Sequence, residues 1–140
     1  MKSVIRVQDA EGRGMFYNTV INDTCNTSVY AIYELDGLCE RHTRFPDAEK
    51  DKIISIAFTA ISLETANEES SILAKRKWRF SFKNLEQFEK WVTRDEVKIL
   101  TDYGYRIVRV FASSVIIGEY QNIFNIDSVT RTEDITDLFL

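Results

Sequence analysis

The sequence has few of the residues that build covalent or metal-bound frameworks: its 140 residues include two cysteines, one histidine and one proline. Cys25 and Cys39 match neither a zinc-ligand spacing nor a CxxC redox motif, so we expect two reduced thiols. His42, Asp47 and Asp51 also match no known metal-ligand spacing, and we expect no metal site. Neither a disulfide nor a structural metal is needed to hold a chain of this length together.

Long apolar runs and excess positive charge are also missing. No stretch of 18 apolar residues is present, and the first residues have a strand pattern rather than the apolar segment of a signal peptide. We therefore expect no membrane partner and a cytoplasmic location. Eighteen Lys and Arg against 22 Asp and Glu give a net charge of −4, which argues against broad binding to nucleic-acid backbones. Residues 75–79 form the one basic cluster with an aromatic inside it. We interpret them first as a charged strand entry, with contact to nucleic acid as the less favoured alternative.

What is present is typical of a globular domain. Hydrophobic residues make up 44% of the chain, charged residues 29% and aromatic residues 12%. Disordered, collagen-like and low-complexity classes are excluded by this composition. With no linker or internal repeat visible, residues 1–140 are expected to form a single domain.

In the first half of the chain, β-branched residues at 3–8 predict a strand that enters a turn-rich loop at 9–14. Gly12 and Gly14 in this loop lack the third glycine of a dinucleotide-binding fingerprint, so we interpret them as positions with φ > 0. Residues 52–63 are rich in Ile and Phe and suit either a buried strand or a core helix, and the pattern does not decide between them.

The second half carries clearer signals. Capping boxes begin two consecutive helices, at 84–92 and 93–103, and Gly104 stands where a left-handed residue ends the second helix. Four strands are expected, together with a tail at 128–140 whose last apolar residues dock a terminal helix. The strands are 78–82, 105–112, 115–117 and 120–126, of which 105–112 is central and covered on both faces. The fold class predicted is α+β, a twisted mixed or antiparallel sheet with the two helices packed on one face.

Two places could carry chemistry. His42 is the one side chain that titrates near neutral pH and is a candidate general base, or else a structural loop residue. Glu119 immediately precedes the expected strand 120–126 and Gln121 lies within it, so the two side chains are expected on the same strand face. They form either the wall of a pocket or the polar face of an edge strand.

A series of motifs follows in a recognisable order along the chain. They are Arg6, 12–17, His42, 45–47, 80–91, Leu100, 104–105 and 118–124. This order resembles a family of small proteins from tailed bacteriophages, and the resemblance covers most of the chain. It implies a phage accessory protein.

A second resemblance is to ADP-ribosyltransferase-like folds, in which an early-strand Arg holds the NAD phosphate or ribose and a late strand carries a Gln/Glu-x-Glu pair. Arg6 and the pair Glu119 and Gln121 occupy comparable places. The resemblance implies a ligand site in which Arg6 holds phosphate, Tyr17 stacks, His42 donates a hydrogen bond or acts as base, and Gln121 orients the substrate. The catalytic Glu is replaced by Gln121, whose neutral amide cannot stabilise an oxocarbenium-like ribose, so such a site could bind a nucleotide without transferring ADP-ribose.

Two functions follow from these observations. In the favoured hypothesis the protein binds and modulates a host or defence protein without a cofactor, because the chain is acidic, aromatic-rich and has no complete catalytic constellation. The alternative is a protein that binds NAD or another nucleotide, with His42 and Glu119 as candidate catalytic residues. The sequence does not identify the partner or the oligomeric state.

Overall fold

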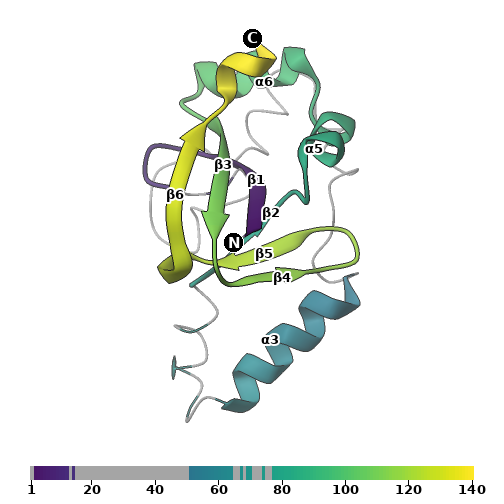
Figure 1. Ribbon diagram of the computed structural model, residues 1–140, viewed down its shortest axis with the longest axis vertical. Helices are drawn as coiled ribbons and strands as arrows, with labels where there is room; N and C mark the ends of the chain where they lie inside the picture. Colours follow the sequence, from purple (N-terminus) through teal and green to yellow (C-terminus); the bar gives the residue numbers. More distant parts are fainter. Residues whose placement is uncertain are drawn as a thin grey trace.

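The computed structural model describes residues 2–12, 14, 51–64, 67, 69, 70, 74 and 77–140. Among these residues there are six strands and three α-helices, with all three helices between the first and the third strand along the chain (Figure 1). The strands are β1 (Lys2–Gln8), β2 (Trp78–Ser81), β3 (Arg106–Ala112), β4 (Val115–Ile117), β5 (Asn122–Asn125) and β6 (Val129–Asp134). The helices are α3 (Lys52–Glu64), α5 (Leu85–Trp91) and α6 (Arg94–Asp102), with 3-10 turns η2 (Ile126–Ser128) and η3 (Thr136–Phe139).

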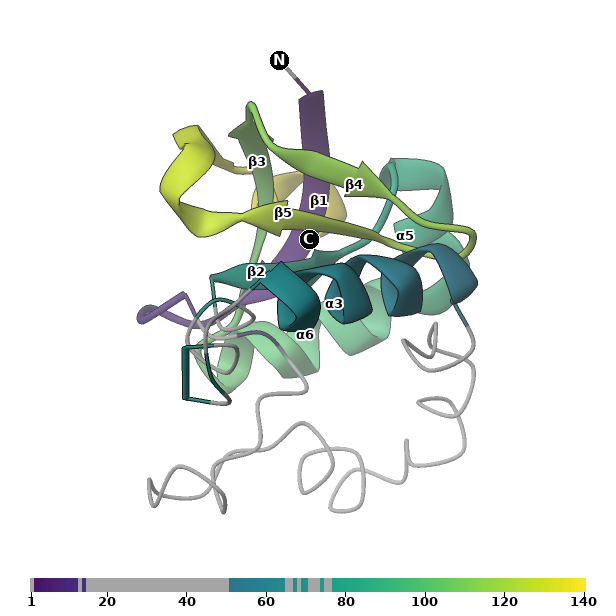
Figure 2. The same cartoon turned by 90° about the horizontal axis from the view of Figure 1, so that it is seen from below.

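The strands form two antiparallel sheets of three strands each. One has the order β1-β3-β6 and the other the order β2-β5-β4. Two hydrogen bonds join the sheets, from Ile5 N to Phe82 O at 3.2 Å and from Phe82 N to Ile5 O at 2.7 Å. Helix α3 lies on the far side of the second sheet from β1 and β3 (Figures 1 and 2). It contacts that sheet through Phe58, whose ring centroid is 6.0 Å from the ring centroid of Phe80 in β2.

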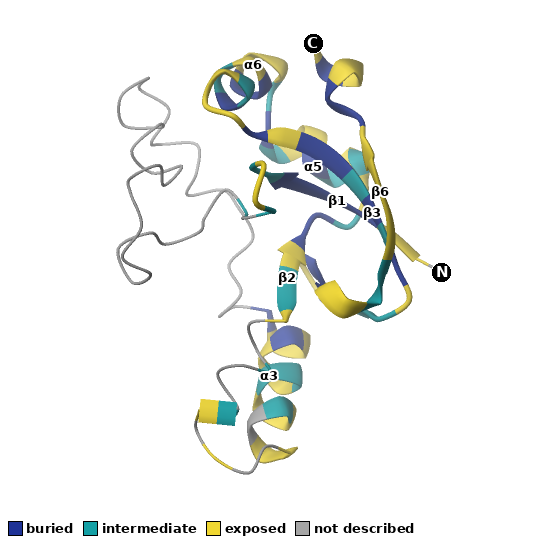
Figure 3. Cartoon of the chain, turned by 90° about the vertical axis from the view of Figure 1, so that its left-hand side faces the viewer, coloured by how far each residue is buried: buried dark blue, intermediate teal, exposed yellow. Residues whose placement is uncertain are grey.

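Side-chain alternation along β1 and β3 divides the core into two clusters. Ile5, Val7 and Ile107 face α5, α6 and η3, where they pack with Phe88 and Leu100. The alternate residues of the same two strands face the second sheet. These are Val4, Val108, Val110 and Ala112, packed with Phe124. Strand β3 is therefore central and covered on both faces, as predicted (Figure 3).

Helices α5 and α6 begin and end where their capping signals predicted. Asn84 Oδ1 accepts a hydrogen bond from Gln87 N at 2.9 Å. Thr93 and Glu96 form a complete capping box, with Glu96 N donating to Thr93 Oγ1 at 3.2 Å and Thr93 N donating to Glu96 Oε1 at 3.1 Å. Gly104 has φ +91°. The α+β class with two consecutive helices on one sheet face is confirmed.

In one segment the structure decides between two predicted alternatives, and in two others it differs from the prediction. Residues 52–63, which suited strand or helix, form α3. Strand β5 begins at Asn122 rather than at 120, because the residues before it belong to the β4–β5 connection. The apolar end of the tail docks as expected, but as a single 3-10 turn, η3, rather than as an α-helix. Residues 129–134, for which no strand was expected, form the edge strand β6, which is held by backbone pairing and is mostly exposed.

Candidate functional site: a buried arginine in an open cavity

Arg6 is a charged residue on a strand face that is otherwise apolar. The pleat of β1 places it on the same face as Val4, and only 5% of the residue is exposed. Its guanidinium donates one hydrogen bond to Phe80 O and another, from Nη2, to Gly12 O at 3.2 Å. Arg6 Nε is buried and has no hydrogen-bond partner among the described residues. The side chain is thus fixed by two carbonyls, while the described residues offer no acceptor to Nε.

The surroundings of Arg6 do not favour its charge. Burial, together with the neighbouring positive charge of Arg79, lowers the pKa of Arg6 from its usual value to about 10, and the charge of Asp9 acts in the opposite direction. A shift of this size corresponds to roughly 3 kcal/mol by which the folded environment disfavours the cation. The ring of Phe124 offsets part of this free-energy cost through a cation–π contact, because its centroid lies 5.7 Å from the guanidinium carbon of Arg6.

An open cavity of about 310 Å³ lies against Arg6. Its lining includes both arginines, Arg6 and Arg79, and the apolar side chains of Val110 and Phe124. The sheet registers explain the grouping, because Arg79 is paired with Phe124 across β2 and β5, and Val110 is paired with Thr132 across β3 and β6. Glu11 and Thr132 also line the cavity. The site therefore combines a desolvated cation, apolar side chains such as Val110 and Phe124, and polar lining residues that include Glu11 and Thr132.

The glycine-containing loop after β1 closes over the guanidinium. Gly12 has φ +80°, as expected for a turn glycine. Gly14 is not in that region, so the expectation that both glycines only allow φ > 0 is wrong for Gly14. A Cβ at Gly14 would lie 3.0 Å from Arg6 Nη2, and Gly14 bridges to Gln8 of β1. Close approach to Arg6 is the physical reason for glycine at this position.

The other predicted site residues are placed elsewhere or lie outside the described residues. Tyr17 and His42 are outside them. Glu119 and Gln121 belong to the loop between β4 and β5 and not to a strand, so the expected strand face is wrong. Glu119 is exposed, whereas Gln121 is 6% exposed with Nε2 lacking a partner among the described residues. Arg6 lines the cavity, and neither loop residue is part of the lining that the structure describes.

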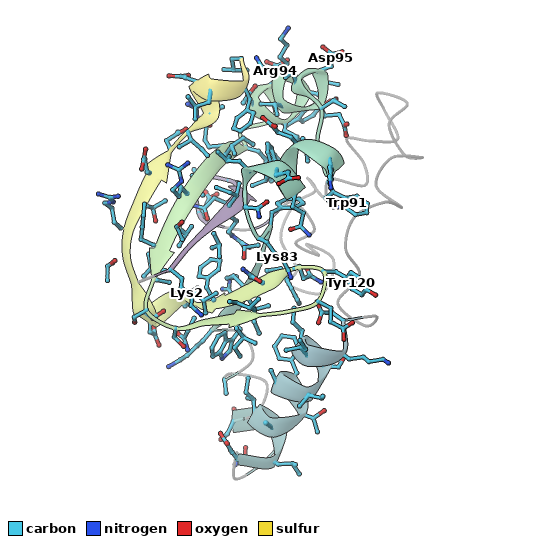
Figure 4. All side chains as sticks on the ribbon, turned by 45° about the vertical axis from the view of Figure 1, so that its right-hand side comes forward. Lys2, Lys83, Trp91, Arg94, Asp95 and Tyr120 are labelled. Carbon is cyan, nitrogen blue, oxygen red and sulfur yellow. The ribbon has the colours of Figure 1, made fainter. Side chains whose placement is uncertain are left out.

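That loop is organised by Asp51, a residue whose structural role the sequence analysis missed. Asp51 is fully buried, and its carboxylate accepts hydrogen bonds from Ile54 N at 3.2 Å and from Tyr120 N at 2.9 Å. Figure 4 labels Tyr120 on the β4–β5 loop. One side chain therefore caps α3 and holds the β4–β5 loop. A Cβ at Gly118 would overlap both Asp51 Oδ2 and Gln121 O, so this position requires glycine. The spacing of Asp51 before Ile54, typical of an N-cap, was the signal available.

Backbone amides determine the ionisation of Asp51. Burial acts to raise the pKa of its carboxyl, but the amide groups of Tyr120, Glu119, Ile54 and Gln121 outweigh burial, and the pKa lies below its usual value. Asp51 is therefore a structural carboxylate whose hydrogen-bonding capacity is taken up inside the chain.

The basic cluster at 75–79 does not act as a unit in the described part of the chain. Lys77 forms an ion pair with Asp127 at 3.0 Å, and Arg79 lines the Arg6 cavity. Residues 75 and 76 lie outside the described residues. Within the described ranges, no group of three or more His, Cys, Asp and Glu is placed to hold a metal ion, and no helix is long and apolar enough to span a bilayer.

A family model with the description "Bacteriophage T4 Y00F protein" covers residues 1–137 of the chain. No curated protein and no solved structure matches it.

Proposed function

Because the chain belongs to the bacteriophage T4 Y00F protein family, we propose that this phage accessory protein binds and modulates a host or defence protein in the host cytoplasm. We propose further that the Arg6 cavity is its recognition site and receives a carboxylate of the partner. Inhibition then follows from occlusion of the partner's surface.

The observation that carries this proposal is the nearly buried side chain of Arg6, which lines an open cavity beside a second arginine, Arg79. A guanidinium held in place by Phe80 O and Gly12 O needs no reorganisation when an anion arrives. Burial and the positive charge of Arg79 disfavour the charged form of Arg6, and an incoming carboxylate offsets both effects. Charge-assisted hydrogen bonds from a desolvated arginine are among the stronger contacts of protein interfaces.

The size of the cavity favours one acidic group over a whole cofactor. Sites for drug-sized ligands span roughly 300–1,000 Å³, and this cavity, at about 310 Å³, is at the lower end. A carboxylate with its side chain fits such a volume, and the apolar wall of Val110 and Phe124 suits the methylene groups that carry it.

The second candidate is an ADP-ribosyltransferase-like protein that binds NAD or another nucleotide. Two arginines and an aromatic face in one cavity support it, because guanidinium groups hold phosphates and aromatic rings stack on bases. In that case the resemblance assigns phosphate to Arg6 and the rest of the ligand to Tyr17, His42 and Gln121, of which Gln121 lies on the β4–β5 loop outside the described lining of this cavity. Gln121 in place of the catalytic Glu argues for binding without transfer.

The experiment uses a variant that blocks the cavity without touching Arg6. Thr132 lines the cavity and is exposed on the edge strand β6, so Thr132→Glu places a carboxylate beside Arg6 at little risk to folding. Immobilised wild type, Thr132→Glu and the matched Thr132→Gln are incubated with extract of host cells, and bound proteins are quantified by mass spectrometry. We expect a partner retained by wild type and Thr132→Gln and lost with Thr132→Glu.

Thermal shifts with succinate, phosphate, ADP and NAD separate the two candidates, since a ligand that binds the native state raises its melting temperature. A shift specific to NAD or ADP that disappears in Thr132→Glu supports the nucleotide candidate. Equal retention of all partners by the three proteins, with no anion-dependent shift, contradicts both.

A further inference from the structure

Helix α3 has two apolar faces, and the described part of the protein covers one of them. The inward face includes Ile54, which is fully buried, and Phe58, which packs on Phe80. A second row lies on a different side of the helix and is exposed. This outer stripe consists of Ile53 (43% exposed), Ile56 (69%), Ala60 (exposed) and Leu63 (82%).

The spacing of the outer stripe is that of a helix–helix seam. Its members stand three, four and three residues apart, the a/d pattern by which one helix packs against another. Figure 3 shows exposed residues alternating with buried and intermediate ones along α3. Scattered exposed apolar residues are normal, but a row of this periodicity on one helix marks an interaction surface.

The stripe is symmetric about the middle of the helix, and this symmetry identifies its partner. When α3 is placed against a second α3 running in the opposite direction, Ile53 faces Leu63 of the second copy and Ile56 faces Ala60. A large side chain thus meets a small one at the centre, which lets the two backbones approach closely.

The charges follow the same symmetry. Lys52 and Glu64 are the only charged residues of α3 and stand at its two ends. In the antiparallel arrangement each Lys52 lies opposite Glu64 of the second copy, whereas a parallel arrangement pairs like charges. We propose that the protein self-associates through α3, as an antiparallel pair of helices related by a two-fold axis that passes through the outer stripe at the level of residue 58.

Such a contact is self-complementary and closes at two copies, as a two-fold interface requires. A 13-residue helix is roughly 20 Å long, so the area covered is smaller than that of a standard stable interface. The dimer is therefore weak and reversible, and we expect a dissociation constant on the order of ten to a few hundred micromolar.

The test is sedimentation equilibrium of the full chain between about 5 and 500 µM. We expect wild type to pass from monomer to dimer over this range, and Ile56→Lys to weaken association at least about tenfold because it buries a charge in the seam. The matched control is Leu138→Lys, an exposed apolar position (59%) on η3, which leaves association unchanged. Circular dichroism of each variant checks that the helices are retained.

A charge exchange tests the antiparallel direction. Lys52→Glu and Glu64→Lys each place like charges opposite one another and weaken the dimer, and the double variant carrying both changes restores it. A wild-type protein that stays monomeric at 500 µM overturns the proposal, whatever else covers the stripe. A dimer indifferent to Ile56→Lys, or a double variant no stronger than the single ones, also overturns it.

Discussion

Replacing Asp51 by asparagine tests how one buried carboxylate joins α3 to the β4–β5 loop. Asp51→Asn keeps the shape of the side chain but leaves one acceptor oxygen for two amide donors, Ile54 N and Tyr120 N. The NH₂ group of the asparagine then faces one of the two backbone N–H groups, which loses its acceptor. A hydrogen bond to a charged group contributes about 1.5–3 kcal/mol, and an unsatisfied buried donor costs about 1–3 kcal/mol. We expect the free energy of unfolding to fall by roughly 3 kcal/mol.

For a chain of this length, 3 kcal/mol corresponds to a fall of roughly 10 °C in melting temperature. Urea and thermal unfolding followed by circular dichroism measure the change, and amide exchange at Tyr120 locates it. The matched control is Glu119→Gln, an exposed carboxylate in the same loop, which we expect to alter stability by less than about 0.5 kcal/mol. A loss below about 1 kcal/mol for Asp51→Asn, or an equal loss for the control, refutes the reasoning.

Acid unfolding gives an independent measure of the same carboxylate. The pKa of Asp51 is lower in the folded chain than in the unfolded chain, where it is about 4. The unfolded state therefore takes up the proton first, and the stabilisation is complete above pH 4 and lost as the pH falls through the folded-state pKa. The pKa of Asp134 is also lowered: burial acts to raise it, but hydrogen bonds from Arg106 and Thr136 outweigh burial, so Asp134 adds to the same acid loss. Wild type should lose stability more steeply than Asp51→Asn below pH 4.

Three further substitutions test the loops. Gly118→Ala should destabilise the fold by several kcal/mol in urea unfolding, because the added Cβ overlaps the backbone oxygen of Gln121 as well as a side chain; a loss under 1 kcal/mol contradicts the close approach. Gly14→Ala should cost less, about 1 kcal/mol, because its Cβ meets the end of the Arg6 side chain, which shifts. It should nonetheless weaken anion binding in calorimetry. Glu11→Gln removes a negative charge from the cavity lining and should strengthen binding of succinate or phosphate several-fold; unchanged affinity places the anion elsewhere.

The features that the sequence predicted correctly are determined by neighbours in the chain. Asn84, Thr93 and Gly104 act on amide and carbonyl groups within a few residues of themselves, so the ends of α5 and α6 can be located without knowing the rest of the fold. The strand β3 could be placed as central because its apolar run requires cover on both faces.

The features that the sequence did not predict depend on contacts between distant segments. Strand β6 is polar and exposed on an edge, and backbone pairing with β3 leaves no apolar pattern to detect. The hydrogen bond from Tyr120 to Asp51 spans 69 residues. Arg6 could be recognised as a charged residue in a strand, but its burial depends on β2 and β5, which cover that face of β1.

The most direct test of the central claim, that Arg6 is a preorganised receptor for a carboxylate, compares the unfolding free energies of Thr132→Glu and Thr132→Gln at pH 7 and low salt. Adding a negative charge to a chain of net charge −4 disfavours the folded state through general repulsion. A carboxylate supplied to the cavity instead stabilises it. We therefore expect Thr132→Glu to be more stable than Thr132→Gln by about 1 kcal/mol. A glutamate variant of equal or lower stability would contradict the account.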